Sequence, residues 1–376
     1  MSGPLEGVKV LELAGIGPAP FCCMMLADAG ADVLRVERIR GGLSGAMSGS
    51  DGTDSARPHW DLMNRGRRSL AVDLKDPGNV ELVLKAASRA DILVEGWRPG
   101  VAERLGLGPD VCLERNPKLV YGRMTGWGQE GPLAQRAGHD IDYIAIAGAL
   151  WAIGRNGDRP VPPINLVGDF GGGGMLAAFG VLAAMVEARG SGKGQVVDIA
   201  MVDGASILMT MVHALTEFGV WKEERGANIL DTGAPFYEVY ETSDNKYIAV
   251  GAIEPQFYAE LLKGIGLDSS DDLPAQMDRD AWPAMKERFA TIFKSKTRDE
   301  WEKIFEGTDS CVAPVLSPSE ARMHPHNLAR SSYVDIDGQT HPTPAPRFSR
   351  TPSSIVRPAP QPGSGGEEAL HEWGIL

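Results

Sequence analysis

Short apolar runs alternate with segments of helical length through residues 1–200. The runs that predict buried strands cover residues 8–13, 33–37, 69–73, 92–95, 119–125 and 195–199. The segments between them include a helix that opens at Pro77 and an apolar helix over residues 175–188. Strand, helix and strand within about thirty residues form the unit of a parallel sheet. The pattern therefore predicts an α/β domain with a Rossmann-like, doubly wound parallel sheet.

The pattern changes after residue 200. Residues 201–218 predict a helix that leads into a different region, and residues 236–240 and 246–251 predict two strands joined by a hairpin loop. Amphipathic helices follow near residues 256–262, 282–293 and 298–305, while residues 342–366 are rich in proline and glycine and predict an extended chain. We expect a large α/β domain (1–200), linker helices (201–230), a small α+β domain (231–330) and a C-terminal extended segment (331–376).

Composition is that of a soluble globular protein, with 43% hydrophobic and 23% charged residues. The longest apolar candidate, residues 175–186, falls short of the roughly 18 to 20 residues of a membrane span, so we expect none. The N-terminus does not read as a signal peptide. Four cysteines, two of them adjacent, form neither a disulfide framework nor a metal-binding spacing. These features favour a cytoplasmic protein.

Two ligand classes are disfavoured. A net charge of −13 argues against nucleic acid, whose binding depends on neutralising phosphates, although a few local arginines can still hold a small anion. Gly15 and Gly17 follow the first strand, but Pro20 stands where the third glycine of a dinucleotide fingerprint is required.

The stretch from Gly138 to Gly174 holds the main candidate chemistry. His139 and Asp169 each open a predicted helix, and an acid and a base brought together can take and return a proton. His139 can equally be a partly buried structural histidine, and Asp169 can be an ordinary N-cap. Four glycines (171–174) follow Asp169, however, and glycine is a poor helix former that a plain cap does not need. They would let an anion or enolate approach bare N–H groups at the positive end of the helix dipole.

Two further side chains can support this pair. Glu254 precedes Pro255 at the start of a predicted helix, where it is either a first-turn carboxylate or the group that orients His139. Asn165 can hold Asp169 in the same way.

Three cations follow strand ends or lie in loops: Arg38, Lys75 and Arg98. Each can bind a phosphate or can be an ordinary surface base. Hydrolase chemistry is disfavoured, because no G-x-S-x-G motif is present and Cys22 and Cys23 lie in an apolar helix where thiols are inert.

Ten short pieces of the chain carry a family resemblance. They are residues 10–15 (VLELAG), 71–75 (AVDLK), 125–129 (TGWGQ), 138–141 (GHDI), 165–166 (NL), 168–173 (GDFGGG), 192–196 (GKGQV), 233–237 (GAPFY), 250–258 (VGAIEPQFY) and 311–315 (CVAPV). With these, the sequence resembles the α-methylacyl-CoA racemases of the class III CoA-transferase family from about residue 4 to 352.

The resemblance implies an isomerase that interconverts (R)- and (S)-2-methylacyl-CoA thioesters by 1,1-proton transfer through an enolate, with no metal and no cofactor beyond the CoA of the substrate. It makes His139 and Asp169 the two acid/bases, one on each face of C2. Glu254 would pair with His139, and Asn165 with Asp169. The enolate oxygen needs preorganised donors, and we expect the backbone N–H of Asp140 to be one of them.

The resemblance also implies a CoA site in the large domain and an interlocked homodimer. The C-terminal segment would return to the large domain, and Glu254 would reach His139 from the partner subunit. The residues implied in CoA binding are Arg38, Val72, Asp73, Leu74, Lys75, Arg98, Gly138, His139, Asp140, Ile141, Asp142 and Tyr143.

Three departures and two alternatives stay open. Asp142 stands where the family commonly has asparagine, the loop over residues 41–60 is longer than the family minimum, and the chain ends in Gly-Ile-Leu rather than a peroxisomal signal, which favours the cytoplasm. One alternative is a class III CoA transferase that uses Asp169 as a nucleophile. The other is a non-catalytic acyl-CoA-binding or scaffold protein.

Overall fold

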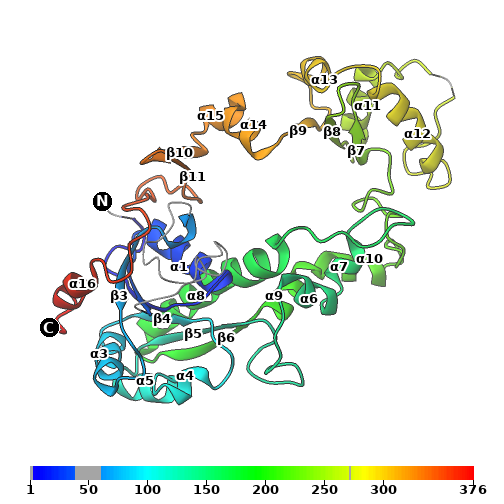
Figure 1. Ribbon diagram of the computed structural model, residues 1–376. Coiled ribbons are helices and arrows are strands. Elements are labelled where there is room, and N and C mark those ends of the chain that lie inside the picture. Colours follow the sequence, from blue (N-terminus) through cyan, green and yellow to red (C-terminus); the bar gives the residue numbers. More distant parts are fainter. Residues whose placement is uncertain (1–2, 39–60, 271) are drawn as a thin grey trace, which may run out of the picture. The chain divides into compact units, whose positions relative to one another are not determined.

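The computed structural model describes residues 3–38, 61–270 and 272–376, and it divides into two compact units (Figure 1). The first unit contains residues up to 147, then 164–208 and 331–376, and the second contains residues 148–163 and 209–330. This division differs from the expected boundaries, because residues 148–163 belong to the second unit and residues 201–208 to the first. The loop expected over residues 41–60 lies outside the described residues.

A six-stranded sheet with the order β3-β2-β1-β4-β5-β6 forms the centre of the first unit. Its strands are β1 (Lys9–Leu13), β2 (Asp32–Glu37), β3 (Arg67–Ala71), β4 (Ile92–Glu95), β5 (Val120–Thr125) and β6 (Gln195–Ala200). Every pair is parallel, and Leu11 of β1 lies opposite Leu34 of β2 and Leu93 of β4. The expected α/β fold with a doubly wound parallel sheet is confirmed, and the strand order reverses between β1 and β4.

Alternate residues of the strands enter two separate cores, which explains why the strands read as continuous apolar runs. Val10, Val33 and Ile92 pack with helices α1 (Pro18–Asp28) and α8 (Leu176–Ser191). Their neighbours Leu11, Leu34 and Leu93 pack on the opposite face. The helices on that opposite face are α3 (Pro77–Ala87), α5 (Pro109–Arg115) and α16 (Gly366–Glu372), with α4 (Val101–Arg104) beside them.

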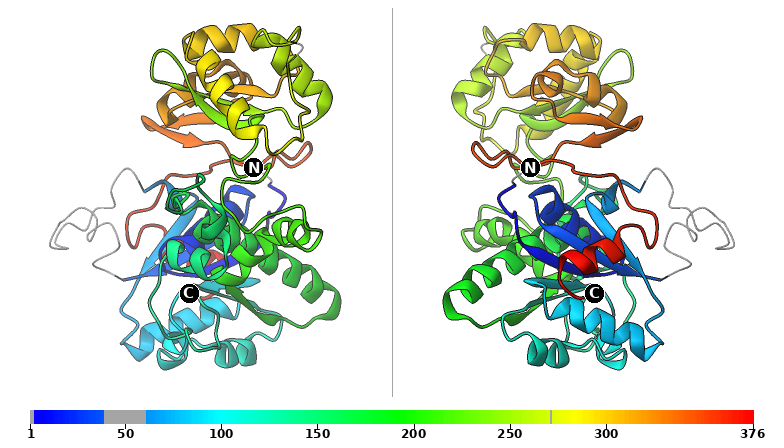
Figure 2. Two further views of the ribbon diagram at one scale, coloured as in Figure 1. Left: turned by 90° about the vertical axis from the view of Figure 1, so that its right-hand side faces the viewer. Right: turned by 90° about the vertical axis from the view of Figure 1, so that its left-hand side faces the viewer.

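The C-terminal segment covers the edge strand β3. Helix α16, red in Figure 2, packs beside β3, and Gly365 forms a bridge with Ser69. Trp373 is buried and donates from Nε1 to Asp32 at 2.6 Å. The segment was expected to be extended, but it contains this helix and a hairpin of β10 (Tyr333–Ile336) and β11 (Gln339–Pro342). Such short elements lack the periodicity that the sequence patterns detect.

The second unit has a three-stranded antiparallel sheet of β7 (Tyr237–Glu241), β8 (Tyr247–Gly251) and β9 (Val312–Val315). The hairpin was expected, whereas β9 was not. Strand β9 contains Pro314, and proline is tolerated in a sheet only in an edge strand, which is the position of β9. The helices of this unit are α7 (Ala149–Ala152), α10 (Thr210–Glu217), α11 (Pro255–Gly264), α12 (Trp282–Phe293), α13 (Arg298–Phe305), α14 (Pro318–Met323) and α15 (Pro325–Ala329). The helix expected over residues 201–218 is divided into α9 (Met201–Leu208) of the first unit and α10.

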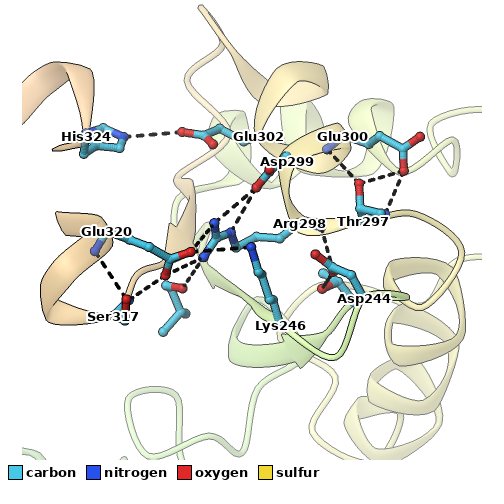
Figure 3. Close-up of polar contacts among 12 residues, drawn as sticks. Asp244, Lys246, Thr297, Arg298, Asp299, Glu300, Glu302, Ser317, Glu320 and His324 are labelled. Carbon is cyan, nitrogen blue, oxygen red and sulfur yellow. Dashed lines mark hydrogen bonds and ion pairs between the residues drawn. The ribbon is translucent and has the colours of Figure 1, made fainter.

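An ion-pair network around Arg298 connects α13 to α14 (Figure 3). The Arg298 guanidinium donates to Glu320 at 2.9 Å, and Lys246 of the hairpin pairs with the same carboxylate at 3.4 Å. The hydrogen bond from Arg298 holds the pKa of Glu320 well below its usual range. Helix α13 also contributes Trp301 and Phe305 to the aromatic core of this unit.

Leu166–Ser191 is a continuous helical stretch that is long and apolar enough to cross a membrane by length and composition alone, with a mean hydropathy of 1.5. The expectation that no apolar stretch reaches that length is therefore wrong. Of its most apolar window, 44% is buried inside the protein, and α8 packs on the sheet beside α1. These contacts are those of a core helix.

Candidate active site

The loops that follow β1 and β4 meet where the strand order reverses, the place where open α/β sheets bind ligands. A Cβ built on Gly15 would lie 3.6 Å from the Cα of Gly96. Gly17 has a φ of 65°, and a Cβ there would lie 3.5 Å from Oδ2 of Asp169. The Asp169 carboxylate therefore lies beside the loop after β1, at this switch point.

His139 is the N-cap of helix α6 (Asp140–Ile146), with an extended backbone and an exposed side chain. Its backbone N–H donates to Oδ2 of Asp142 at 2.9 Å. A carboxylate at the third helical position that accepts the N-cap N–H is half of a capping box, and its charge is favourable near the positive end of the helix. Asp142, the departure from the family pattern, is thus a capping residue that fixes the backbone of His139.

Tyr143 packs against the segment of the chain that precedes His139. A Cβ on Gly126 would lie 2.1 Å from its ring, and one on Gly138 would lie 2.8 Å away, so both positions require glycine. The phenol donates to the backbone carbonyl of Gly138, and the ring meets Trp127 edge-on at 4.8 Å between centroids. Burial, with the carboxylates of Asp169 and Asp142 next, raises the pKa of Tyr143 to about 12.

Asp169 is not an N-cap, which was one of the two interpretations that the sequence left open. It lies in the first turn of the π-helix η2 (Leu166–Met175), whose N-cap position is held by Asn165. π-Helical turns are rare and occur often at functional sites. An aspartate at the start of a helix is typical of a cap, whereas here the helix has its N-cap position four residues earlier.

The glycine run after Asp169 is explained by close helix packing. A Cβ on Gly172 would lie 2.7 Å from the backbone nitrogen of Ala205, and one on Gly204 would lie 1.9 Å from the carbonyl oxygen of Gly172. A Cβ on Gly174 would likewise lie 2.7 Å from the ring of Phe21. The glycines therefore allow η2 to pack against α9 and α1.

Two N–H groups in the first turn of η2 are accepted by a side chain of the protein itself. The Oδ1 atom of Asp140 accepts the N–H groups of Gly168 and Asp169, each at 2.7 Å. These two groups are therefore not open to an anion or enolate, and the glycines expected to expose bare N–H groups lie inside η2 rather than at its start.

The Asn165 amide donates to Oδ2 of Asp169 at 3.0 Å, the contact expected from the sequence. Burial raises the pKa of the Asp169 carboxyl, the Asn165 hydrogen bond lowers it, the Asp140 charge raises it, and His139 lowers it. The net shift is upward, so the proton-bound form is stabilised relative to an ordinary aspartate. The influence of His139 shows that the expected acid and base lie within electrostatic reach of each other.

Glu254 lies in the second unit as the exposed N-cap residue of α11. Its carboxylate contributes, after burial, to a raised pKa of the Cys311 thiol. Its expected partner His139 belongs to the first unit, and their pairing stays a prediction.

A cavity of about 530 Å³ lies between the loop after β3 and the end of α4. Leu74 and Lys75 line it, as does Arg104, which the sequence patterns did not single out because it reads as an ordinary surface base of a short helix. In the part of the chain that the structure describes, neither Lys75 nor Arg104 has a carboxylate within ion-pair distance. The two cations can therefore receive an anionic ligand.

The other residues expected to bind CoA differ in exposure, and none of those below lines this cavity. Arg38, exposed, follows β2, and Arg98, also exposed, follows β4. Asp73 is exposed, and Ile141 is 44% exposed on α6. The Val72 side chain is part of the buried core, so only its backbone is available to a ligand.

Cys22 and Cys23 are fully buried in α1, and burial raises the pKa of Cys23 far above its usual value, as expected of thiols in an apolar helix. Within residues 3–38, 61–270 and 272–376, no group of three or more histidine, cysteine or acidic side chains is arranged to hold a metal ion.

Comparison with known proteins identifies relatives of this chain. The family model of CoA-transferase family III matches residues 5–365. The chain is 48% identical to α-methylacyl-CoA racemase of Mus musculus, covering 99% of this chain and 93% of that protein, and 44% identical to the Homo sapiens racemase, covering 99% and 94%. A CAIB/BAIF family protein from Brucella suis has the same fold, with a TM-score of 0.81, 23% identity and coverage of 99% and 100%.

These relatives confirm the expectation of an enzyme of the isomerase class and the family resemblance of the sequence. The match of the family model extends over nearly the whole chain, from the start of the first unit to the bridge beside β3. The chain belongs to CoA-transferase family III.

Proposed function

We propose that this protein interconverts (R)- and (S)-2-methylacyl-CoA thioesters by 1,1-proton transfer through an enolate. The observation that supports the proposal is the position of Asp169 beside the loop after β1, together with the contact of Asp140, the residue after His139, with the Asp169 N–H. Two relatives named α-methylacyl-CoA racemase, at 48% and 44% identity, support the same reaction. His139 and Asp169 are the two acid/bases in this proposal.

Each base serves one face of C2. One residue removes the α-proton, and the other, already protonated, delivers a proton to the opposite face, which inverts the centre. The raised pKa of Asp169 suits this role, because a group that must both accept and return a proton works best when its pKa approaches the working pH. Asn165 holds the Asp169 carboxylate in place at 3.0 Å.

The enolate oxygen requires donors that are fixed before the reaction, each worth roughly 3 to 4 kcal/mol. The N–H of Asp140 is suited to this task, since it is the first of helix α6 and such groups have no acceptor within the helix. It also lies at the positive end of the helix dipole.

The CoA part of the substrate would bind around Arg38, Lys75, Arg98 and the backbone that leads to Tyr143. We add Arg104, because its guanidinium lines the same cavity as Lys75. The phosphates bound by these cations would hold the thioester in place while the two bases act on C2. No metal or further cofactor takes part in the proposed reaction.

We also propose a homodimer in which the partner subunit's Glu254 supports the charged form of His139. Large apolar side chains on α8 and α9 are exposed in the single chain, with Phe179 at 70%, Val186 at 68% and Ile207 at 59%. Exposed apolar groups of this extent on neighbouring helices are typical of an interface. A monomer in sedimentation velocity would remove this part of the proposal.

Incubation of either 2-methylacyl-CoA enantiomer with the protein in deuterated water tests the reaction. We expect racemisation with uptake of deuterium at C2, and loss of both when His139 is replaced by alanine. Transfer of CoA to an added free acid without exchange at C2 would instead establish a transferase with Asp169 as nucleophile. Binding without either reaction would establish an acyl-CoA-binding protein.

A further inference from the structure

The Asp140 carboxylate connects the two residues that we propose as bases. Asp140 follows His139 directly in the chain, and its Oδ1 atom accepts the backbone N–H of Asp169 at 2.7 Å. The same oxygen accepts the N–H of Gly168 at 2.7 Å. One carboxylate oxygen thus joins the start of α6 to the first turn of η2.

The bridge requires a glycine on its other side. A Cβ on Gly168 would lie 2.6 Å from Oδ1 of Asp140 and 3.0 Å from its Cγ, and it would meet Ile144 at 3.2 Å. A side chain at position 168 would therefore push the carboxylate out of place. The Asp140 carboxylate thus fits in its place only because position 168, which lies 28 residues away in the chain, has no side chain.

The second oxygen of Asp140 shows that capping is an incomplete explanation. Asp140 is only 5% exposed, and its Oδ2 atom is buried without a hydrogen-bond partner among the described residues. A buried carboxylate with an unpaired oxygen is costly. An asparagine would accept the same two N–H groups without a buried charge. Capping alone therefore does not account for the negative charge of Asp140.

We propose that Asp140 is a positioning residue whose carboxylate holds the backbone of Asp169 against that of His139 and places a negative charge beside the Asp169 carboxyl. Its effect on turnover rests on the proposed function. The backbone of His139 is itself fixed by Asp142, so both bases have supported main chains.

The charged and titratable groups that act on Asp169 have opposing effects. Burial raises its pKa, the Asn165 amide and His139 lower it, and the Asp140 charge raises it. Tyr143 also lies within electrostatic reach but stays neutral, since its own pKa is raised to about 12. Removal of the Asp140 charge is therefore expected to lower the pKa of Asp169.

The test is Asp140→Asn, which keeps an acceptor for the two N–H groups and removes the charge. In either direction of racemisation one base must be protonated and the other free, so the pair holds one proton in total. The plot of kcat/KM against pH is therefore bell-shaped, and its acid limb reports the pKa of the more acidic base. We expect the acid limb to move to lower pH and kcat to fall about tenfold or more, while KM stays within about threefold. Gly168→Ala, which displaces the carboxylate without removing it, should lower kcat with a similar KM.

The matched control is Asp91→Asn. Asp91 also accepts a backbone N–H, that of Lys9 at 2.8 Å, but at the amino end of the sheet away from the site. Its variant should keep the wild-type kcat and pH profile. An Asp140→Asn protein that folds, as shown by its circular dichroism, and keeps both quantities would overturn the inference, as would an equal effect at Asp91.

A direct titration separates this inference from the proposed reaction. Selective ¹³C labelling of aspartate, with the Asp169 signal assigned by Asp169→Asn, reports the pKa of Asp169 without any substrate. A lower pKa in Asp140→Asn than in the wild type supports the inference, and an unchanged pKa overturns it. If the wild-type protein neither racemises nor exchanges deuterium, the proposed function fails while this titration still decides the role of Asp140.

Discussion

The carboxylates around the site have separate tasks at the scale of single residues. Asp142 accepts the N–H of His139, and Asp140 accepts the N–H of Asp169. Asp169 itself receives the side-chain amide of Asn165. Two carboxylates thus fix backbones, and the third is held in position as an acid/base.

Asn165→Ala should shift the titration of the site in the direction opposite to Asp140→Asn. The Asn165 amide lowers the pKa of Asp169, so its removal raises that pKa, and the acid limb of kcat/KM moves to higher pH. We expect kcat/KM near neutral pH to fall roughly tenfold or more, because a hydrogen bond to a charged group is worth about 1.5–3 kcal/mol. Asn156→Ala removes an exposed amide–carboxylate contact of 3.1 Å elsewhere and should leave the profile unchanged. An acid limb that stays in place would contradict the assignment of Asp169.

The sequence identified His139, Asn165 and Asp169 because each stands in a short local pattern next to glycines or a predicted helix start. It could not identify the carboxylate bridge of Asp140, since that contact depends on how α6 packs against η2. Gly168, which leaves room for this carboxylate, was present in the sequence, but it cannot be told apart by pattern from the other glycines near Asp169. Asp142 was named but unexplained, although its position three residues after His139 is that of a capping box.

At the scale of elements, the approach of η2 to α9 fixes where Asp169 lies. The two helices touch through backbone atoms at Gly172 and Gly204, which leaves no room for a Cβ at either position. Contact of this kind transmits a small displacement directly, because neither side can yield by a side-chain rotation.

Gly204→Ala should destabilise the protein by about 2 kcal/mol or more and reduce turnover, since its Cβ would lie 1.9 Å from the carbonyl oxygen of Gly172. Gly190→Ala is the matched control. Gly190 lies within α8 with nothing within 4 Å of an added Cβ, so alanine should be neutral or stabilising by up to about 1 kcal/mol. Urea unfolding of the two variants beside the wild type measures the difference. Equal stability of Gly204→Ala and the wild type would show that the helices can separate without cost.

Element prediction succeeded where the apolar pattern was clear. Strand β4 and helices α12 and α13 have the predicted bounds, because β4 lies in a continuous apolar run and the apolar positions of the two helices repeat at helical spacing. The π-helix was missed, since its widened turn has no such signature. Strand β9 contains Pro314, and β10 and β11 lack a continuous apolar run. These short elements acquire their structure from the strands that they pair with.

At the scale of the whole chain, the C-terminal segment completes the first unit. Besides α16 on the edge strand, His341 of β11 is buried next to Arg65, with its Nδ1 atom 3.4 Å from Nη1. Arg65 also pairs with Asp28 of α1 and donates to the carbonyl of Pro342 at 3.1 Å. This cluster ties the returning segment to the start of the fold.

His341 should make the stability of the protein sensitive to mild acid. Burial lowers the pKa of His341, and the Arg65 guanidinium lowers it further, which outweighs the opposite effect of Asp28 and Asp335. A histidine in the unfolded chain has a pKa of about 6.5, so the unfolded state binds more protons, and stability falls as the pH drops from about 6.5 through the lower folded value.

The variant His341→Gln removes this titration and should flatten the pH dependence of the urea midpoint between about pH 7.5 and 5. His371→Gln, at an exposed position on α16, is the control and should keep the wild-type slope. Glu12 titrates in a lower range: burial raises its pKa, but Arg35 and Arg67 outweigh burial and hold it below the usual value, so its contribution is lost only under stronger acid. A wild-type slope in His341→Gln would show that protonation of this histidine does not release the C-terminal segment, and the acid sensitivity would then belong to other carboxylates of the fold.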